Sequence, residues 1–243
     1  MGQRDEVYRD PKRQIVDFSF DQDVAEVFAD MIRRSVPGYE TVVPAAGLLA
    51  ARHLATLPAS QHLVYDLGCS LGASTLAVLQ QFPHSTLSVL AVDNSSAMLE
   101  RARALITDPR VSFSCEDVQT MEMQPAGVMI LNFLLQFILP DNRNDLLARI
   151  RRSLDPGGLL IVSEKLRFAE QSEQTFYESS HLDYKRANGY SELEISAKRS
   201  ALEHVMITDT EEEHRARFAA AGFGPVRKWF QCMNWVSYLV YCP

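Results

Sequence analysis

The sequence predicts one α/β domain built on a mostly parallel central sheet. From residue 63 onward, short apolar runs alternate with helical patterns, which is typical of parallel strands joined by right-handed crossovers. A glycine-containing turn joins the first apolar run to the first helical pattern, and polar residues follow several later runs. We expect the domain to span 1–243, with an N-terminal helical cover at 1–60 and a lid insertion at 164–208.

The turn lies in the segment LVYDLGCSLG, Leu63–Gly72. Gly68 allows a tight turn, and Gly72 allows the following helix to start close to the strand. Free N–H groups at a helix start face the carboxyl end of the strand, where open α/β sheets bind ligands. The segment lacks the middle glycine of G-x-G-x-x-G, so a pyrophosphate would have less room. An ordinary strand–helix turn is the alternative.

The periodicity predicts the remaining elements in order. The expected strands lie at 63–67, 87–92, 111–115, 127–132, 158–163, 226–231 and 235–241. The expected helices within the alternation lie at 72–81, 95–106 and 141–153, and a further one ends at Ala221. Asn94 or Ser95 is expected to cap the second of these helices. Asp155-Pro156-Gly157-Gly158 predicts a turn between the third helix and the fifth strand.

Polar residues end three of the expected strands. Asp93 follows the second strand, where a carboxylate suits a ribose diol. Asp117 follows the third strand and suits an exocyclic amine, while the Val118 N–H suits a ring nitrogen. Asn132 ends the fourth strand and offers a donor and an acceptor to an amino-acid group. This pattern, without a phosphate cradle, indicates a nucleoside that lacks phosphates, of which S-adenosylmethionine is the usual example.

One helical segment precedes the first expected strand, and another follows the fifth. A stripe of apolar residues at 24–32 predicts an amphipathic helix, Val36–Tyr39 breaks it, and Val42–Leu54 resumes helical character. The polar insertion at 164–208 follows the fifth strand and is placed to roof the site. It contains four cationic residues that could meet an anionic substrate, with solvated helix faces as the alternative: Lys185, Arg186, Lys198 and Arg199.

Composition limits the class of protein. The formal charge is −7 with no long basic run, which disfavours direct binding to a large nucleic acid. The four cysteines are spread along the chain without C-x-x-C, so we expect free thiols and neither a disulfide framework nor a metal site. We see neither a secretory signal nor a spanning segment, and expect a soluble cytoplasmic protein with no membrane contact.

Several longer motifs carry a family resemblance. They cover most of the chain from about residue 18 and read VPGY at 36–39, YDLGCSLG at 65–72, VDNS at 92–95, LNFLLQF at 131–137, KRANGYSELEIS at 185–196, KRSALEHVM at 198–206 and WFQCMN at 229–234. The chain resembles class I S-adenosylmethionine (SAM)-dependent methyltransferases. More closely, it resembles the carboxy-S-adenosyl-L-methionine synthase family of bacterial tRNA wobble-uridine modification. The resemblance implies a Rossmann-like class I methyltransferase fold, with helices on both faces of the sheet and a helical lid insertion.

The resemblance also implies an activity and a set of binding residues. Members of that family join SAM and prephenate to give carboxy-S-adenosyl-L-methionine and phenylpyruvate, and the product serves a tRNA carboxymethyltransferase. A homodimer is expected. Carried over, Arg199 would have the catalytic role, near the sulfonium and its new carboxylate. The positions implied to bind SAM or its carboxylated product are Tyr39, Gly68, Cys69, Ser70, Asp93, Asn94, Asp117, Val118, Asn132 and Arg199.

The implied chemistry needs positioning and charge and no protein nucleophile. Prephenate loses carbon dioxide and hydroxide as it aromatises. The hydroxide takes a proton from the sulfonium methyl group, and the resulting carbanion adds to the trapped carbon dioxide. Two other functions are consistent with the same nucleoside site. One is a SAM-dependent small-molecule methyltransferase, and the other is a non-catalytic protein that binds the nucleoside and regulates a tRNA-modifying partner.

Overall fold

The computed structural model describes residues 3–10 and 17–243, and its centre is a seven-stranded sheet. The strand order is β3-β2-β1-β4-β5-β7-β6, with β7 antiparallel to both of its neighbours and the other pairs parallel. The strands are β1 Leu63–Leu67, β2 Ser88–Asp93, β3 Val111–Cys115, β4 Ala126–Asn132, β5 Leu154–Lys165, β6 Val226–Cys232 and β7 Trp235–Tyr241. The predicted mostly parallel sheet is confirmed.

Helices cover both faces of this sheet because its central strands are apolar on both sides. Tyr65 and Met129 point into one hydrophobic cluster, while their neighbours Val64 and Val128 point into another. The first cluster includes residues of α5 Pro140–Ser153 and α8 Glu211–Ala220. The second includes residues of α2 Tyr39–Leu54 and α3 Ala73–Gln81. α4 Ser96–Leu105 lies beside β2 and β3.

The turn predicted at Asp155-Pro156-Gly157-Gly158 is wrong, because β5 begins before it. α5 ends at Ser153, and Leu154 already pairs with Ala126 of β4. The next pair joins Val128 to Leu159, so the four residues between them bulge out of the ladder. Gly157 has φ +77°, which a bulge uses as readily as a turn does.

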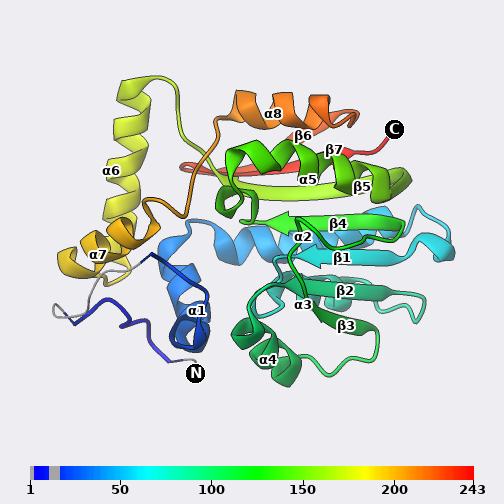
Figure 1. Ribbon diagram of the computed structural model, residues 1–243, viewed down its shortest axis with the longest axis horizontal. Helices are drawn as coiled ribbons and strands as arrows, with labels where there is room; N and C mark the ends of the chain where they lie inside the picture. Colours follow the sequence, from blue (N-terminus) through cyan, green and yellow to red (C-terminus); the bar gives the residue numbers. More distant parts are fainter. Residues whose placement is uncertain (1–2, 11–16) are drawn as a thin grey trace.

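Three helices lie at the carboxyl ends of the parallel strands. The arrowheads of β1 and β4 point toward the side of the molecule that carries α1, α6 and α7 (Figure 1). These helices are α1 Gln22–Ser35, α6 Gln171–Ala187 and α7 Glu192–Leu202. α1 begins at its N-cap Asp21, which accepts from the Val24 N–H at 3.0 Å. Within the described residues, no helix is long and apolar enough to cross a membrane.

The end of α1 is bonded directly to α6. His181 Nε2 lies 2.7 Å from the Ser35 carbonyl oxygen, and the Tyr184 hydroxyl donates to the Arg33 carbonyl at 3.0 Å. Arg34 Nε donates to the carbonyl of Asn188, just after α6, at 2.7 Å. The N-terminal cover and the insertion, which are far apart in sequence, therefore form one wall at this end of the sheet.

Candidate functional site

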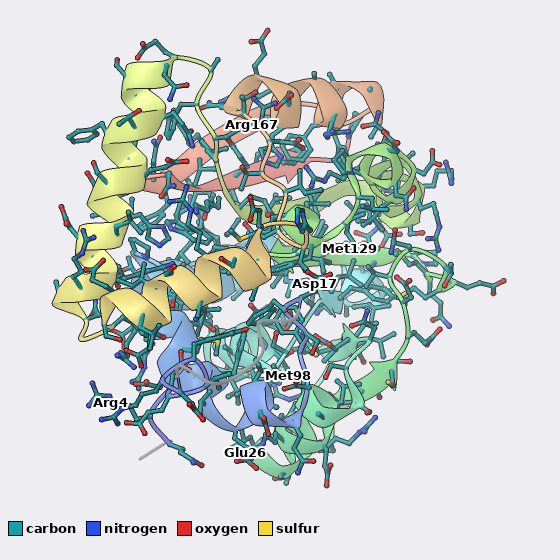
Figure 2. The ribbon with its side chains drawn as sticks, turned by 60° about the vertical axis from the view of Figure 1, so that its left-hand side comes forward. Arg4, Asp17, Glu26, Met98, Met129 and Arg167 are labelled. Atoms are coloured by element: carbon teal, nitrogen blue, oxygen red, sulfur yellow. The ribbon has the colours of Figure 1, made fainter. Side chains whose placement is uncertain are left out.

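A cavity of about 670 Å³ lies at the carboxyl ends of the parallel strands. Residues of α1, α6 and α7 line it together with the strand ends, and Figure 2 shows α7 crossing the front of the molecule from the lower end of α6. Nine of the ten predicted binding positions line this cavity: Tyr39, Gly68, Cys69, Ser70, Asp93, Asn94, Asp117, Val118 and Asn132. Residues from six different elements and loops therefore meet at one place.

The glycine turn folds back onto the end of β2. Gly68 N and Cys69 N both donate to the Val92 carbonyl, at 2.8 and 2.9 Å. Gly68 has φ +73°, and a Cβ there would come within 2.9 Å of Leu134 Cδ1. Ser70 adopts φ +48° although it is not a glycine. Such backbone strain is typical of ligand-binding turns, and the surrounding bonds hold it in place.

Asp93 fastens the turn and still faces the cavity. Its Oδ2 accepts from Ser70 N at 2.8 Å, and its Oδ1 accepts from Ser95 N at 2.9 Å. Ser95 in turn caps α4, which settles the choice between Asn94 and Ser95. Burial raises the pKa of Asp93, and the two N–H donors partly offset that effect. A carboxylate accepts about four hydrogen bonds, so acceptor positions remain for a diol.

Asp66 supports the same turn from below without lining the cavity. Its Oδ2 accepts from the backbone N and the Oγ1 of Thr75, at 2.9 and 2.7 Å, which fixes the first turn of α3. Burial raises the pKa of Asp66 to about 6. Its role is structural, and it provides a natural comparison for Asp93.

The end of the cavity near β3 is acidic. Asp117 and Glu116 both line it, and neither is drawn into an ion pair within the described residues. Asp117 Oδ1 accepts from Gln119 N at 2.9 Å, which curls the chain after β3. Val118 is buried there and adds an apolar surface to the lining of the cavity. Sequence reasoning missed Glu116, although it stands beside Asp117.

Asn132 provides an unpaired acceptor in the middle of the cavity. Its Nδ2 donates to Ser74 Oγ at 2.9 Å, while its buried Oδ1 has no partner among the described residues. An orphaned buried acceptor fits a ligand ammonium group, such as that of the methionine end of SAM. The next residue, Phe133, adopts φ +63° and packs against Tyr39 and Trp235.

Glu164 holds the segment that follows Asn132, and sequence reasoning missed it. Its carboxyl group accepts from the backbone N–H groups of Leu134, Leu135 and Gln136, at 3.0, 2.7 and 3.1 Å. Burial raises the pKa of Glu164 to about 8, although these three donors and the Arg143 charge act in the opposite direction. The sequence feature that could have identified Glu164 is an acidic residue inside an otherwise apolar strand.

The opposite end of the cavity is cationic. Lys165, Lys185 and Lys198 line it together with His181. Lys165 ends β5 and was not predicted, whereas Lys185 and Lys198 belong to the predicted cationic group. Burial lowers the pKa of His181 to about 2, with the lysine charges acting in the same direction, so the imidazole is neutral.

The two arginines of the predicted cationic group lie apart from the cavity. Arg186 is exposed and pairs with Asp183 and Glu192, at 2.7 and 2.6 Å. Arg199 is exposed on α7 and does not line the cavity of its own chain. Its charge is still felt there, because it contributes to the lowered pKa values of Lys165 and Lys185.

The described residues do not form a metal-binding site. No group of three or more His, Cys, Asp or Glu side chains among them could hold a metal ion. Nor is Cys69 a ready nucleophile, because burial raises the pKa of its thiol, with further contributions from Asp66 and Asp93.

Sequence comparison decides the family. The chain is 47% identical, over 96% of each sequence, to the carboxy-S-adenosyl-L-methionine synthase of Shewanella putrefaciens. The chain belongs to the carboxy-S-adenosyl-L-methionine synthase family. The synthase of the same name from Pseudomonas putida (strain GB-1) is 49% identical, over 97% of each sequence. A methyltransferase domain family also matches residues 64–158, which include the glycine turn, Asp93 and Asn132. The matched methyltransferase domain therefore covers several of the strand ends that line the cavity.

Solved structures confirm the fold of this synthase family member. Human N-acetylserotonin methyltransferase, solved in complex with SAM, superposes with a TM-score of 0.61 at 16% identity, covering 90% of this chain and 55% of that one. An O-methyltransferase of Nostoc punctiforme, described as putative, gives a TM-score of 0.63 at 18% identity and covers 90% of this chain and 59% of its own. The predicted Rossmann-like class I methyltransferase fold is confirmed.

Proposed function

We propose that this enzyme converts SAM and prephenate to carboxy-S-adenosyl-L-methionine and phenylpyruvate. The observation that carries the proposal is the opposite polarity of the two ends of the 670 Å³ cavity. An acidic end formed by Asp93, Glu116 and Asp117 suits the nucleoside, and a lysine-lined end suits an anion. Asn132 and the aromatic residues Phe133 and Trp235 lie among the residues that line the space. One cavity thus offers complementary surfaces to both substrates.

The nucleoside would be held by the strand ends in order. Asp93 receives the ribose hydroxyls, while Asp117 and Val118 receive the adenine. Asn94 contacts the ribose and adenine beside Asp93. Tyr39, the turn at 68–70 and the free Oδ1 of Asn132 receive the methionine end. This arrangement would direct the sulfonium methyl group toward the aromatic and cationic part of the cavity.

The side chains near that point favour a reaction in which the substrate provides its own base. His181 is neutral and already bonded to Ser35, and Cys69 is held as a thiol. The protein supplies an apolar surface of aromatic rings and positively charged side chains in the same cavity. Carbon dioxide released from prephenate would be retained in such a space until it reacts.

We further propose that Arg199 binds the new carboxylate of the product. Arg199 does not line the cavity of its own chain, so this role requires either a movement of α7 or a contribution from the partner subunit of a homodimer. An arginine fork binds a carboxylate through two parallel hydrogen bonds. The product would then pass to a tRNA carboxymethyltransferase in the cytoplasm.

Mass spectrometry of the small molecules tests the proposal. The purified protein is incubated with SAM, with and without prephenate. A product about 44 Da heavier than SAM, the mass of the added carbon dioxide, should form only when prephenate is present. Formation of S-adenosylhomocysteine and a methylated acceptor would instead indicate a small-molecule methyltransferase. Binding of SAM without any turnover would indicate a non-catalytic nucleoside-binding protein.

A further inference from the structure

The lysines of this chain are few and unusually concentrated. The sequence contains five lysines, and three of them line the same cavity: Lys165, Lys185 and Lys198. Lys185 is 8% exposed and Lys198 is 5% exposed. Lysine is ordinarily found on the surface, because its ammonium group is strongly hydrated. Three lysines on three separate elements that converge on one cavity therefore require an explanation.

Internal partners do not provide that explanation. Lys198 Nζ lies 3.1 Å from Ser35 Oγ and 3.6 Å from Asp5 Oδ2. In contrast, the ammonium groups of Lys165 and Lys185 have no hydrogen bond or ion pair with any residue that the structure describes. Lys165 Nζ does lie 5.9 Å from the centre of the Trp235 ring. Two of the three lysines that line the cavity thus have no protein anion at ion-pair distance among the described residues.

The cluster is electrostatically unfavourable as it stands. Burial lowers the pKa of Lys185 to about 7, and repulsion from Lys198, Lys165 and Arg199 acts in the same direction. Burial also lowers the pKa of Lys165 and of Lys198 to about 8. A bound anion would relieve this repulsion, since it would supply the opposite charge that the protein lacks.

The net charge of the three lysines and their neighbours indicates how many negative charges a bound ligand should carry. Asp5 offsets the charge of one lysine, because it lies 3.6 Å from Lys198. Near Lys165, the attraction of Glu178 and the repulsion of Arg199 oppose one another. Fully protonated, the cluster therefore presents two positive charges to the cavity, which matches a small dianion and exceeds what one carboxylate would neutralise.

We propose that Lys165, Lys185 and Lys198 form the subsite for the second substrate, and that this subsite selects a compound with two carboxylate groups. Phe133 and Trp235 line the same cavity and provide an apolar surface for the ring between those groups. This inference rests on the proposed function, in that prephenate is a dicarboxylate and phenylpyruvate has only one carboxylate. The inference adds the lysines that would distinguish prephenate from phenylpyruvate.

Binding without turnover tests the subsite directly. The protein is loaded with S-adenosylhomocysteine, which lacks the reactive methyl group, and is titrated with prephenate or phenylpyruvate in a calorimeter. The wild type should bind prephenate at least about 10-fold more tightly than phenylpyruvate. Lys185→Met and Lys165→Met should each weaken prephenate binding about 10- to 100-fold and leave S-adenosylhomocysteine affinity within about twofold.

Lys228→Met is the matched control. Lys228 is exposed, pairs with Glu211 at 2.7 Å and lies outside the cavity, so this variant should bind prephenate like the wild type. Thermal stability gives a second readout. Removing an unpaired ammonium group should raise the melting temperature of Lys185→Met, as expected for a residue retained for binding. A fall in both melting temperature and S-adenosylhomocysteine affinity would show that the lysine is structural and would overturn the proposal.

The outcomes separate this proposal from the proposed function. Prephenate affinity within twofold of wild type in both cavity variants would overturn the subsite, even if the wild type makes carboxy-S-adenosyl-L-methionine. Conversely, a wild type that prefers the dicarboxylate and loses that preference in Lys185→Met, yet produces no carboxylated product, would support the subsite and contradict the proposed function.

Discussion

Replacing Asp93 by alanine should weaken SAM binding through loss of the ribose contact. Both carboxylate oxygens already accept one backbone N–H, and the remaining acceptor positions face the cavity. Charge-assisted hydrogen bonds contribute about 1.5–3 kcal/mol, so the affinity for SAM should fall about 10- to 150-fold in Asp93→Ala. Isothermal titration calorimetry on the purified variant measures this change.

The same variant also releases the turn at Ser70, so loss of affinity alone is ambiguous. Comparing adenosine with 2′,3′-dideoxyadenosine removes the ambiguity, because only adenosine carries the diol. In the wild type, adenosine should bind about 10-fold or more tightly than its dideoxy analogue, and in Asp93→Ala the two should bind about equally. An affinity ratio that is unchanged by the substitution would refute the assignment of Asp93 to the ribose.

Asp66→Asn is the control for this experiment. Asp66 supports the neighbouring turn through Thr75 but does not line the cavity. The variant should be less stable or unchanged in stability, while the preference for adenosine over the dideoxy analogue should be retained. A lost preference in Asp66→Asn would mean that the ratio reports loop geometry and not contact with the diol.

Three further predictions concern residues elsewhere in the site. Asn132→Ala should weaken SAM binding about 10-fold and leave adenosine binding nearly intact, if its unpaired Oδ1 accepts from the methionine end as proposed. Equal losses of affinity for the two ligands in calorimetry would contradict this. Arg199→Lys and Arg199→Ala should both weaken carboxy-S-adenosyl-L-methionine more than SAM, and an unchanged ratio of the two affinities would move the carboxylate contact elsewhere. The folded state raises the pKa of Glu164 to about 8 from 4.5, so the folded protein retains that proton and its stability should fall as pH rises from about 4.5 to 8. Urea unfolding should show that Glu164→Gln reduces this dependence, and an undiminished slope would contradict it.

The parts of the site that the sequence predicts are those built from short segments. Strand, glycine turn and helix start occupy only ten residues at Leu63–Gly72, and the acid at the end of the next strand follows from the parallel topology. Asn132 is found by the same reasoning. In each case the local pattern fixes both the element and the end of the sheet at which the side chain lies.

Lys165 and Glu164 depend on tertiary packing, and the sequence does not predict their roles. Lys165 looks like an ordinary lysine after a strand, and only the folding of α6 and α7 over that strand brings it to Lys185 and Lys198. Glu164 gains its role from the backbone of 134–136, which lies about thirty residues away in sequence. Neither the clustering of the lysines nor the contact between Glu164 and 134–136 can be recognised from residues that are neighbours in sequence.

Two sequence signals were ambiguous in physical terms. Asp155–Gly158 has the composition of a turn, but a bulge also uses a glycine with positive φ, and pairing with β4 favours the bulge. Lys198 and Arg199 are adjacent in sequence and therefore point about 100° apart on a helix. The structure buries Lys198 in the cavity and leaves Arg199 exposed, and the sequence does not show which of them faces inward.

Isotope labelling is the most direct test of the central claim, that this enzyme builds a carboxymethyl group from two substrates in one cavity. The reaction is run with SAM carrying a trideuterated methyl group and prephenate carrying carbon-13 in its ring carboxylate. The predicted product retains two of the three deuterium atoms and contains the carbon-13 label, as read by mass spectrometry. A product that retains all three deuterium atoms on a transferred methyl group, or that lacks carbon-13, would contradict the account.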